Sequence, residues 1–128
     1  VEGLRQTGML AQLATRLHER AEHSVQAAAW GAGITLAFVC NLMNNLPAGL
    51  IAHSTVAADH LPQQVTNALL VGVDLGPNLS ITGSLATILW LSAIRREGED
   101  VTFKTFLLRG AVVMPPALIL ALAGLLFR

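Results

Sequence analysis

Charged residues are absent from three long stretches of this 128-residue chain. No Asp, Glu, Lys or Arg occurs in residues 24–58 or 110–127, and Asp74 is the only one in residues 60–94. A helix that crosses the hydrocarbon core of a bilayer needs about 20 predominantly apolar residues. Each stretch approaches or exceeds that length, which predicts an all-α integral membrane protein in contact with the lipid bilayer.

Composition supports the same class and excludes several others. The chain is 53% hydrophobic and 12% charged, with a mean hydropathy of +0.58, which is too apolar for an ordinary soluble domain. Its formal net charge of zero argues against nucleic acid as a partner. The single cysteine, Cys40, excludes a thiolate cage, and the four histidines lack helical metal-site spacing, so we expect neither metal nor cofactor. There is also no phosphate-binding loop, so ATP hydrolysis is not expected.

Residues 1–24 have the pattern of an amphipathic helix. Apolar residues recur at helical spacing among charged ones, namely Leu4, Met9, Leu10, Leu13 and Leu17 among Arg5, Arg16, Glu19, Arg20 and Glu22. Such a helix suits a connector that lies along the membrane surface. Since Val1 is not an initiator methionine and no signal peptide follows, we expect the sequence to open within a longer protein.

The stretch 27–58 is uncharged but is interrupted near its middle by three asparagines, the last two being Asn44 and Asn45, and by Pro47. About a dozen apolar residues precede the interruption and about as many follow it, and neither limb is long enough to span a bilayer alone. Two interpretations remain: one kinked span, or a re-entrant hairpin whose polar tip is satisfied by surrounding protein. Counting positive charges in the loops favours the kinked span.

The stretch 65–94 predicts a broken helix. Two short helical runs flank residues 74–83, where Gly76, Pro77 and Gly83 interrupt the pattern. Proline removes a backbone donor and clashes with the preceding turn, while glycine permits unusual backbone angles. Thr102 is placed to cap a final transmembrane helix over residues 106–127, in which two prolines are tolerated.

Two uncharged elements, each broken by proline or glycine at mid-depth, are typical of discontinuous helices that meet at a transport site. The polar or permissive residues beside the breaks are therefore the candidate substrate-binding groups: Asn44, Asn45, Asn78, Ser80, Thr82, Gly83 and Ser84. Pro47, Gly76 and Pro77 are the expected helix-breaking residues. The alternative is that these polar groups only hold a helix bundle together.

Asp74 and Cys40 are the other candidates. A carboxylate within a membrane run is costly and commonly serves as a proton relay, so we assign Asp74 to proton coupling; the alternative is a structural ion pair. Cys40 is a possible ligand for a thiophilic substrate. A lone buried cysteine, however, more commonly behaves as a small hydrophobic residue.

Two segments of the chain resemble a known family. Residues 40–47, reading Cys-Asn-Leu-Met-Asn-Asn-Leu-Pro, and residues 72–90, with Asp-Leu-Gly-Pro-Asn followed by Gly-Ser-Leu-Ala-Thr-Ile-Leu-Trp, are similar to segments of the ArsB arsenite/antimonite efflux permeases. The resemblance extends over the whole chain. It implies the C-terminal part of an ion-transporter-superfamily fold, with inverted repeats, a re-entrant hairpin and a discontinuous transmembrane helix.

The resemblance also implies a function. It implies export of arsenite and antimonite as neutral hydroxides in exchange for protons, by a multi-pass protein of the bacterial inner membrane that in some organisms works with an ArsA-type ATPase. A neutral trihydroxide needs hydrogen-bonding groups and no counter-charge, in keeping with membrane runs free of Lys and Arg. The alternatives are a dicarboxylate or cation transporter of the same superfamily and, in another class, a membrane-embedded structural subunit.

Overall fold

The computed structural model describes residue 3 and residues 7–127 of the chain. Within this part all regular structure is helical, as the sequence predicts. The α-helices are α2 (Met9–His23), α3 (Val25–Met43), α4 (Asn45–Ala58), α5 (Gln63–Leu75), α6 (Leu85–Arg96) and α7 (Phe103–Leu126). Two short 3-10 helices, η1 (Gly76–Leu79) and η2 (Ile81–Gly83), separate α5 from α6.

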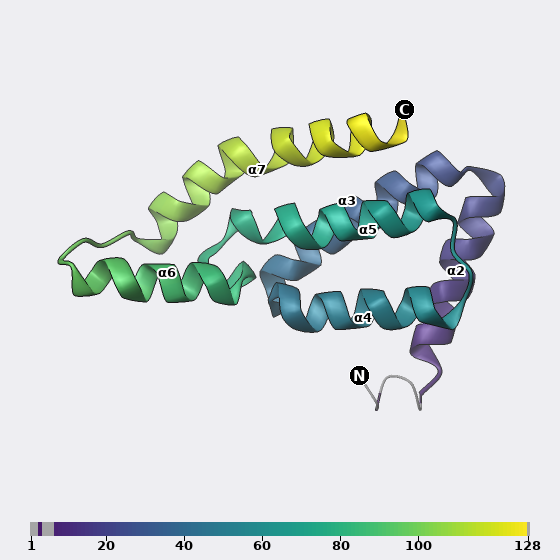
Figure 1. Cartoon of the computed structure of the whole chain (residues 1–128), viewed down its shortest axis with the longest axis horizontal. Coiled ribbons are helices and arrows are strands. Elements are labelled where there is room, and N and C mark those ends of the chain that lie inside the picture. The colour runs from purple at the N-terminus through teal and green to yellow at the C-terminus, as the bar shows by residue number, and fades with distance from the viewer. Residues whose placement is uncertain (1–2, 4–6, 128) are drawn as a thin grey trace.

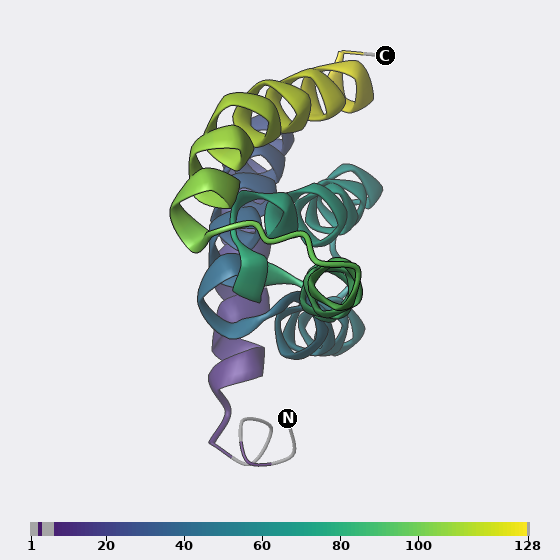
Figure 2. The same cartoon turned by 90° about the vertical axis from the view of Figure 1, so that its left-hand side faces the viewer.

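Helices α3, α4 and α5 lie side by side along the long axis of the molecule, and α2 crosses the end at which α3 begins (Figure 1). Figure 2, turned by 90°, looks along α4 and α6 and again shows α2 running across the direction of the other helices. The chain reverses direction at Asn44, so that α4 runs back beside α3. Residues 27–58 thus form a helical hairpin and not a single kinked helix.

The first limb of this hairpin is longer than the sequence interpretation made it. Helix α3 has 19 residues and continues through Asn41 as far as Met43. Pro47 explains where α3 stops, because in a continuous helix its ring would clash with the carbonyl of residue 43, four positions earlier. In the described residues, α3 and the 24-residue α7 are the two helices long and apolar enough to cross a membrane.

Helices α3 and α5 make the most extensive contact in the molecule, and small residues allow it. A Cβ atom added to Gly33 would lie 2.9 Å from the Ala68 carbonyl oxygen, and one added to Gly72 would lie 2.5 Å from the Gly33 carbonyl oxygen. A Cβ atom on Gly76 would lie 2.4 Å from the Cα atom of Ala37. Such close backbone approach through small residues is how helices pack in a membrane, where hydrophobic exclusion from water contributes little.

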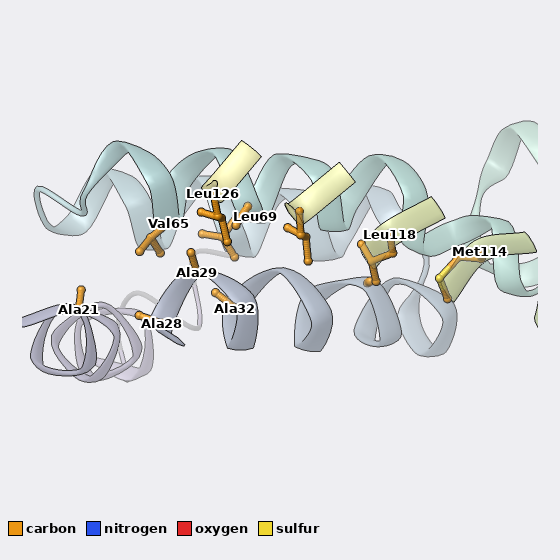
Figure 3. Packing of buried hydrophobic residues seen from close by; sticks show 12 residues of the cluster. Ala21, Ala28, Ala29, Ala32, Val65, Leu69, Met114, Leu118 and Leu126 are labelled. Atoms are coloured by element: carbon orange, nitrogen blue, oxygen red, sulfur yellow. The ribbon is translucent and has the colours of Figure 1, made fainter. Parts of the chain in front are cut away.

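Helix α7 covers the α3/α5 pair with a row of side chains four residues apart. Met114, Leu118, Leu122 and Leu126 are all buried and belong to one hydrophobic cluster with alanines of α3 and with Val65 and Leu69 of α5. Figure 3 shows the labelled members of this cluster between the helices. The helix continues through its two internal prolines, as expected. Its N-terminus is capped as predicted, because the Thr102 hydroxyl accepts a 3.2 Å hydrogen bond from the Thr105 amide.

Helix α2 has the amphipathic character predicted for residues 1–24. Leu10, Ala14 and Ala21 are buried against the rest of the chain, whereas its charged side chains are largely exposed. Leu4 and Arg5, which belong to the same predicted pattern, lie outside the described residues. Helix α2 runs across the direction of α3, α4 and α5 (Figure 1), and its place along the membrane surface stays a prediction.

Candidate functional site

The tip of the hairpin is a single strained residue. Asn44 separates α3 from α4 and has φ 76° and ψ 151°, a backbone conformation that is otherwise almost confined to glycine. Two hydrogen bonds hold it there: its Oδ1 accepts from the Leu46 amide at 3.2 Å, and its Nδ2 donates to the Thr82 carbonyl at 3.1 Å. The second bond joins the hairpin tip to the interruption in the α5–α6 helix.

The interruption itself occupies residues 76–84, close to the predicted 74–83. Gly76 and Pro77 are both buried at the start of η1, where the chain tightens from α to 3-10 geometry. Gly83 has no room for a side chain, because a Cβ atom there would lie 2.6 Å from the Pro77 carbonyl oxygen. Ser84 then starts α6 by accepting a 3.1 Å hydrogen bond from the Ala86 amide. The break is therefore a compact, well-packed turn.

One side-chain amide, that of Asn41 in the last turn of α3, joins α3 to the α5–α6 interruption. The Nδ2 of Asn41 donates to the carbonyls of Ala37 at 2.8 Å and Gly76 at 2.7 Å, while its Oδ1 accepts from the amide and hydroxyl of Ser80 at 3.0 and 2.9 Å. Because carbonyls only accept and a backbone amide only donates, these partners fix which way the side chain points. Every hydrogen-bonding position of this side chain is used, three of the four bonds reaching across to the broken helix.

Asn41 was not among the predicted site residues. From the sequence, the three asparagines of residues 41–45 form one polar tip, in which Asn44 and Asn45 are the predicted ligands. Yet Asn41 continues a row of small residues on α3, four apart, that faces α5: Ala29, Gly33 and Ala37. That spacing is the signal that could have found it, because it places Asn41 on the face turned to the broken helix.

Most of the predicted polar residues are already bonded within the chain. Ser80 is buried and bonded to Asn41, and the Thr82 hydroxyl contacts the Ser80 hydroxyl at 3.3 Å and donates to the Asn41 carbonyl at 3.4 Å. Asn44 and Ser84 use their side chains as caps. These residues build the site, and their free hydrogen-bonding capacity is small.

Three predicted groups remain open. The Asn45 side chain and the Asp74 carboxylate have no hydrogen-bond or ionic partner within the described part of the chain. Asn78 uses its Nδ2 on the Leu75 carbonyl at 3.1 Å and on the Asp74 carbonyl at 3.4 Å, which leaves its Oδ1 free. Asp74 and Asn78 are both exposed and lie one turn apart.

The register of α4 and α5 places these open groups at a similar level along the two helices. Gly49 of α4 lies opposite Val73 of α5, since a Cβ atom on Gly49 would sit 3.6 Å from a Val73 methyl group. The two helices run in opposite directions (Figure 1), so Asn45, one turn before Gly49, comes level with residue 77. Asn45 therefore lies at about the same level along the helix axes as Asp74 and Asn78.

Cys40 and Pro47 have different surroundings from these open groups. Cys40 is fully buried by this chain alone, which is the behaviour of a small hydrophobic residue. Pro47, predicted to break a helix, lies in the first turn of α4, where proline is tolerated. The break lies three residues earlier, at Asn44, for the steric reason given above.

Comparison with known proteins identifies the family. The profile of the arsenical pump membrane protein family, ArsB, matches residues 1–128, the whole chain. The chain belongs to the ArsB family. An arsenical pump membrane protein of Escherichia coli is 33% identical over 100% of this ArsB-family chain, and one of Yersinia enterocolitica is 31% identical over 100% of it. A putative arsenical pump membrane protein of Bacillus subtilis (strain 168) is 24% identical over 99% of it.

The ArsB-family chain is shorter than these relatives. It spans 31% of the length of the Escherichia coli and Yersinia enterocolitica proteins and 30% of the Bacillus subtilis protein. No solved structure matches it. The family match confirms the resemblance drawn from residues 40–47 and 72–90, and it places the chain among membrane proteins.

Proposed function

We propose that this chain is the C-terminal part of a secondary carrier that exports As(OH)₃ and Sb(OH)₃ from bacteria in exchange for protons. Membership of the ArsB family supports an arsenical substrate. The long apolar helices α3 and α7 support a multi-pass protein, which we place in the inner membrane. An ArsA-type ATPase on the cytoplasmic side is a further partner that the family resemblance allows.

The observation that carries this proposal is the joining of the two helix breaks. Asn41 and Asn44 tie the tip of the α3–α4 hairpin to the turn between α5 and α6. In the ion-transporter-superfamily arrangement that the resemblance implies, this hairpin is re-entrant and has a counterpart in an inverted repeat. Broken helices that meet in this way are the usual sites for substrate in secondary transporters.

The groups left open at this junction suit a neutral trihydroxide. Asn45 offers amide N–H donors and a carbonyl acceptor, and Asn78 offers a free carbonyl oxygen. Helices α4 and α6 also begin here, and the first amides of a helix lack partners within it. The stretch 60–94 contains no Lys or Arg that would select an anion such as a dicarboxylate. We therefore divide the predicted residues into Asn45 and Asn78, which contact substrate, and Asn44, Ser80, Thr82, Gly83 and Ser84, which hold the site.

Asp74 is the proposed proton carrier. Its carboxylate is one turn from Asn78 and has no ionic partner in the described residues. Protonated Asp74 would favour one orientation of the carrier. Release of the proton on the cytoplasmic side would let the neighbouring amides engage As(OH)₃, so that proton and substrate bind alternately.

Uptake of arsenite by everted membrane vesicles tests this assignment. We expect vesicles that contain the full-length carrier to accumulate arsenite when a proton gradient is imposed. Asp74→Asn should reduce gradient-driven uptake by roughly tenfold or more, because the exchanged proton loses its binding group. Asp100→Asn, which alters only an exposed pair with Arg95, is the control and should leave uptake unchanged. Normal gradient-driven uptake in Asp74→Asn would show that Asp74 does not couple proton movement to transport. Arsenite uptake that does not depend on the proton gradient would contradict arsenite–proton exchange.

Substitution of Asn45 tests the substrate contact separately. Asn45→Ala should raise the KM for arsenite about five- to tenfold, the equivalent of one lost hydrogen bond. It should leave thermal stability nearly unchanged, since the side chain has no partner within the described residues. Asn67→Ala is the matched control on α5, where Asn67 accepts a 2.8 Å bond from Gln63 on an exposed surface. An unchanged KM in Asn45→Ala would exclude Asn45 from the substrate site.

A further inference from the structure

A groove of about 470 Å³ lies between α2 and the α3–α4 hairpin, and none of the residues assigned above to the helix breaks lines it. Its long wall is α3 from Ala27 to Val39, its second wall is α4, and Leu69 of α5 also lines it. Small residues on α3, among them Gly31, leave the space open: a Cβ atom on Gly31 would meet nothing within 4 Å. The groove is therefore an apolar channel that begins beneath α2 and follows α3.

The α2 side of this groove is positively charged. Arg16 and Arg20 lie one turn apart on α2 and both line the groove. Neither forms an ion pair within the described part of the chain, and both side chains are exposed. The acidic residues of α2, Glu19 and Glu22, are not among the groove-lining residues. Two exposed guanidinium groups, without an ion-pair partner in the described residues, thus line the α2 side of an apolar groove.

The dimensions and direction of the groove match one leaflet of a bilayer. Thirteen residues of α3, from Ala27 to Val39, extend about 18 Å at helical rise. Half of a hydrocarbon core of roughly 30 Å is about 15 Å. Because α2 runs across the end of α3 (Figures 1 and 2), α2 would follow the membrane surface while the groove descends into the leaflet.

From these observations we propose that the groove binds an anionic phospholipid, with an acyl chain along α3 and the phosphate at Arg16 and Arg20. Guanidinium pairs bind phosphate oxygens through several directed hydrogen bonds, and basic groups at the membrane surface favour anionic over neutral lipids. The lipid would hold α2 against the hairpin, because its phosphate contacts α2 and its acyl chain contacts α3. This site is independent of substrate transport, and its test does not use transport as a readout.

Native mass spectrometry of the full-length protein tests the site. The protein is released from nanodiscs that hold equal amounts of phosphatidylglycerol and phosphatidylcholine, and the retained lipids are counted. We expect retained phosphatidylglycerol to exceed phosphatidylcholine by roughly tenfold, the preference that two nearby arginines confer. The combined change Arg16→Gln and Arg20→Gln should abolish this preference, whereas Arg96→Gln, at the exposed end of α6, should keep it.

A second variant blocks the groove without touching charge. Gly31→Leu places a side chain in the open channel and should remove the retained lipid. Gly124→Leu on α7, where a Cβ atom also meets nothing within 4 Å, is the matched control and should retain it. Three results would each overturn the proposal. These are equal retention of both lipids by the unaltered protein, retention of phosphatidylglycerol by the Arg16/Arg20 and Gly31 variants at the level of the unaltered protein, and no retained lipid at all. The last result would mean that another part of the protein fills the groove.

Discussion

Gly76→Ala is expected to destabilise the protein by about 2–3 kcal/mol or more, an unusual cost for one methyl group. The added Cβ atom would lie 2.4, 2.5 and 2.8 Å from the Cα, O and C atoms of Ala37. All three atoms belong to the backbone of α3, so no side-chain rotation relieves the overlap. The start of the broken turn would have to move away from α3, and the Asn41–Gly76 hydrogen bond of 2.7 Å would lengthen with it.

The same substitution at open glycines provides the control. Gly31→Ala and Gly124→Ala add a methyl group where nothing lies within 4 Å. Alanine is the better helix former by about 0.5–1 kcal/mol, so these variants should be as stable as the starting protein or slightly more stable. Melting temperatures of the full-length protein in one detergent compare all three variants. A Gly76→Ala variant that melts with the controls would show that α3 and the turn are less closely packed than described.

The sequence predicts the outline of this fold because charge and helix-breaking residues act locally. Absence of charge located the long apolar helices α3 and α7, and Gly76 with Pro77 located the interruption to within two residues. Thr102 was recognised as a cap from its position alone, and the structure confirms its hydrogen bond. Each of these depends on properties of neighbouring residues in the chain.

The errors arise where contacts distant in sequence decide the structure. The end of the first hairpin limb was placed too early because Asn41 looks like a helix-interrupting residue, whereas bonds to residues 35 and 39 positions away keep it satisfied inside α3. Counting charges favoured one kinked span, yet the chain turns back at Asn44. A polar residue that is bonded cannot be told from one that is open without its tertiary partners. The sequence therefore grouped Ser80 and Thr82 with Asn45.

The second large effect is expected at Asn41. Asn41→Asp keeps the size and shape of the side chain but replaces its two N–H donors with an acceptor oxygen. That oxygen would face the carbonyls of Ala37 and Gly76, which now accept at 2.8 and 2.7 Å. Each buried carbonyl left without a donor costs about 1–3 kcal/mol, so we expect a loss of about 2–4 kcal/mol in stability together with loss of arsenite export.

Asn67→Asp separates this network from the general effect of a new negative charge on a helix. Asn67 lies on α5 and accepts a bond from Gln63 through its oxygen, a role that aspartate can keep. The free energy of unfolding of the control should therefore lie within about 0.5 kcal/mol of that of the starting protein, as is usual for surface substitutions. Arsenite accumulation in everted vesicles should follow the same division, with transport kept in Asn67→Asp and lost in Asn41→Asp.

Asn41→Ala shows whether transport is lost because the hydrogen bonds between α3 and the broken helix are removed or because a buried negative charge is introduced. Alanine removes the side-chain bonds from α3 to the α5–α6 interruption without adding a carboxylate, and it leaves the amide of Ser80 and the carbonyl of Gly76 without their present partners. If Asn41 acts by holding the hairpin tip to the broken helix, Asn41→Ala should fail in transport as Asn41→Asp does. Full transport by a stable Asn41→Ala protein would show that the two breaks meet without this amide. The substrate site would then depend on the bonds that remain, from Asn44 to the Thr82 carbonyl and from the Thr82 hydroxyl to the backbone carbonyl of residue 41.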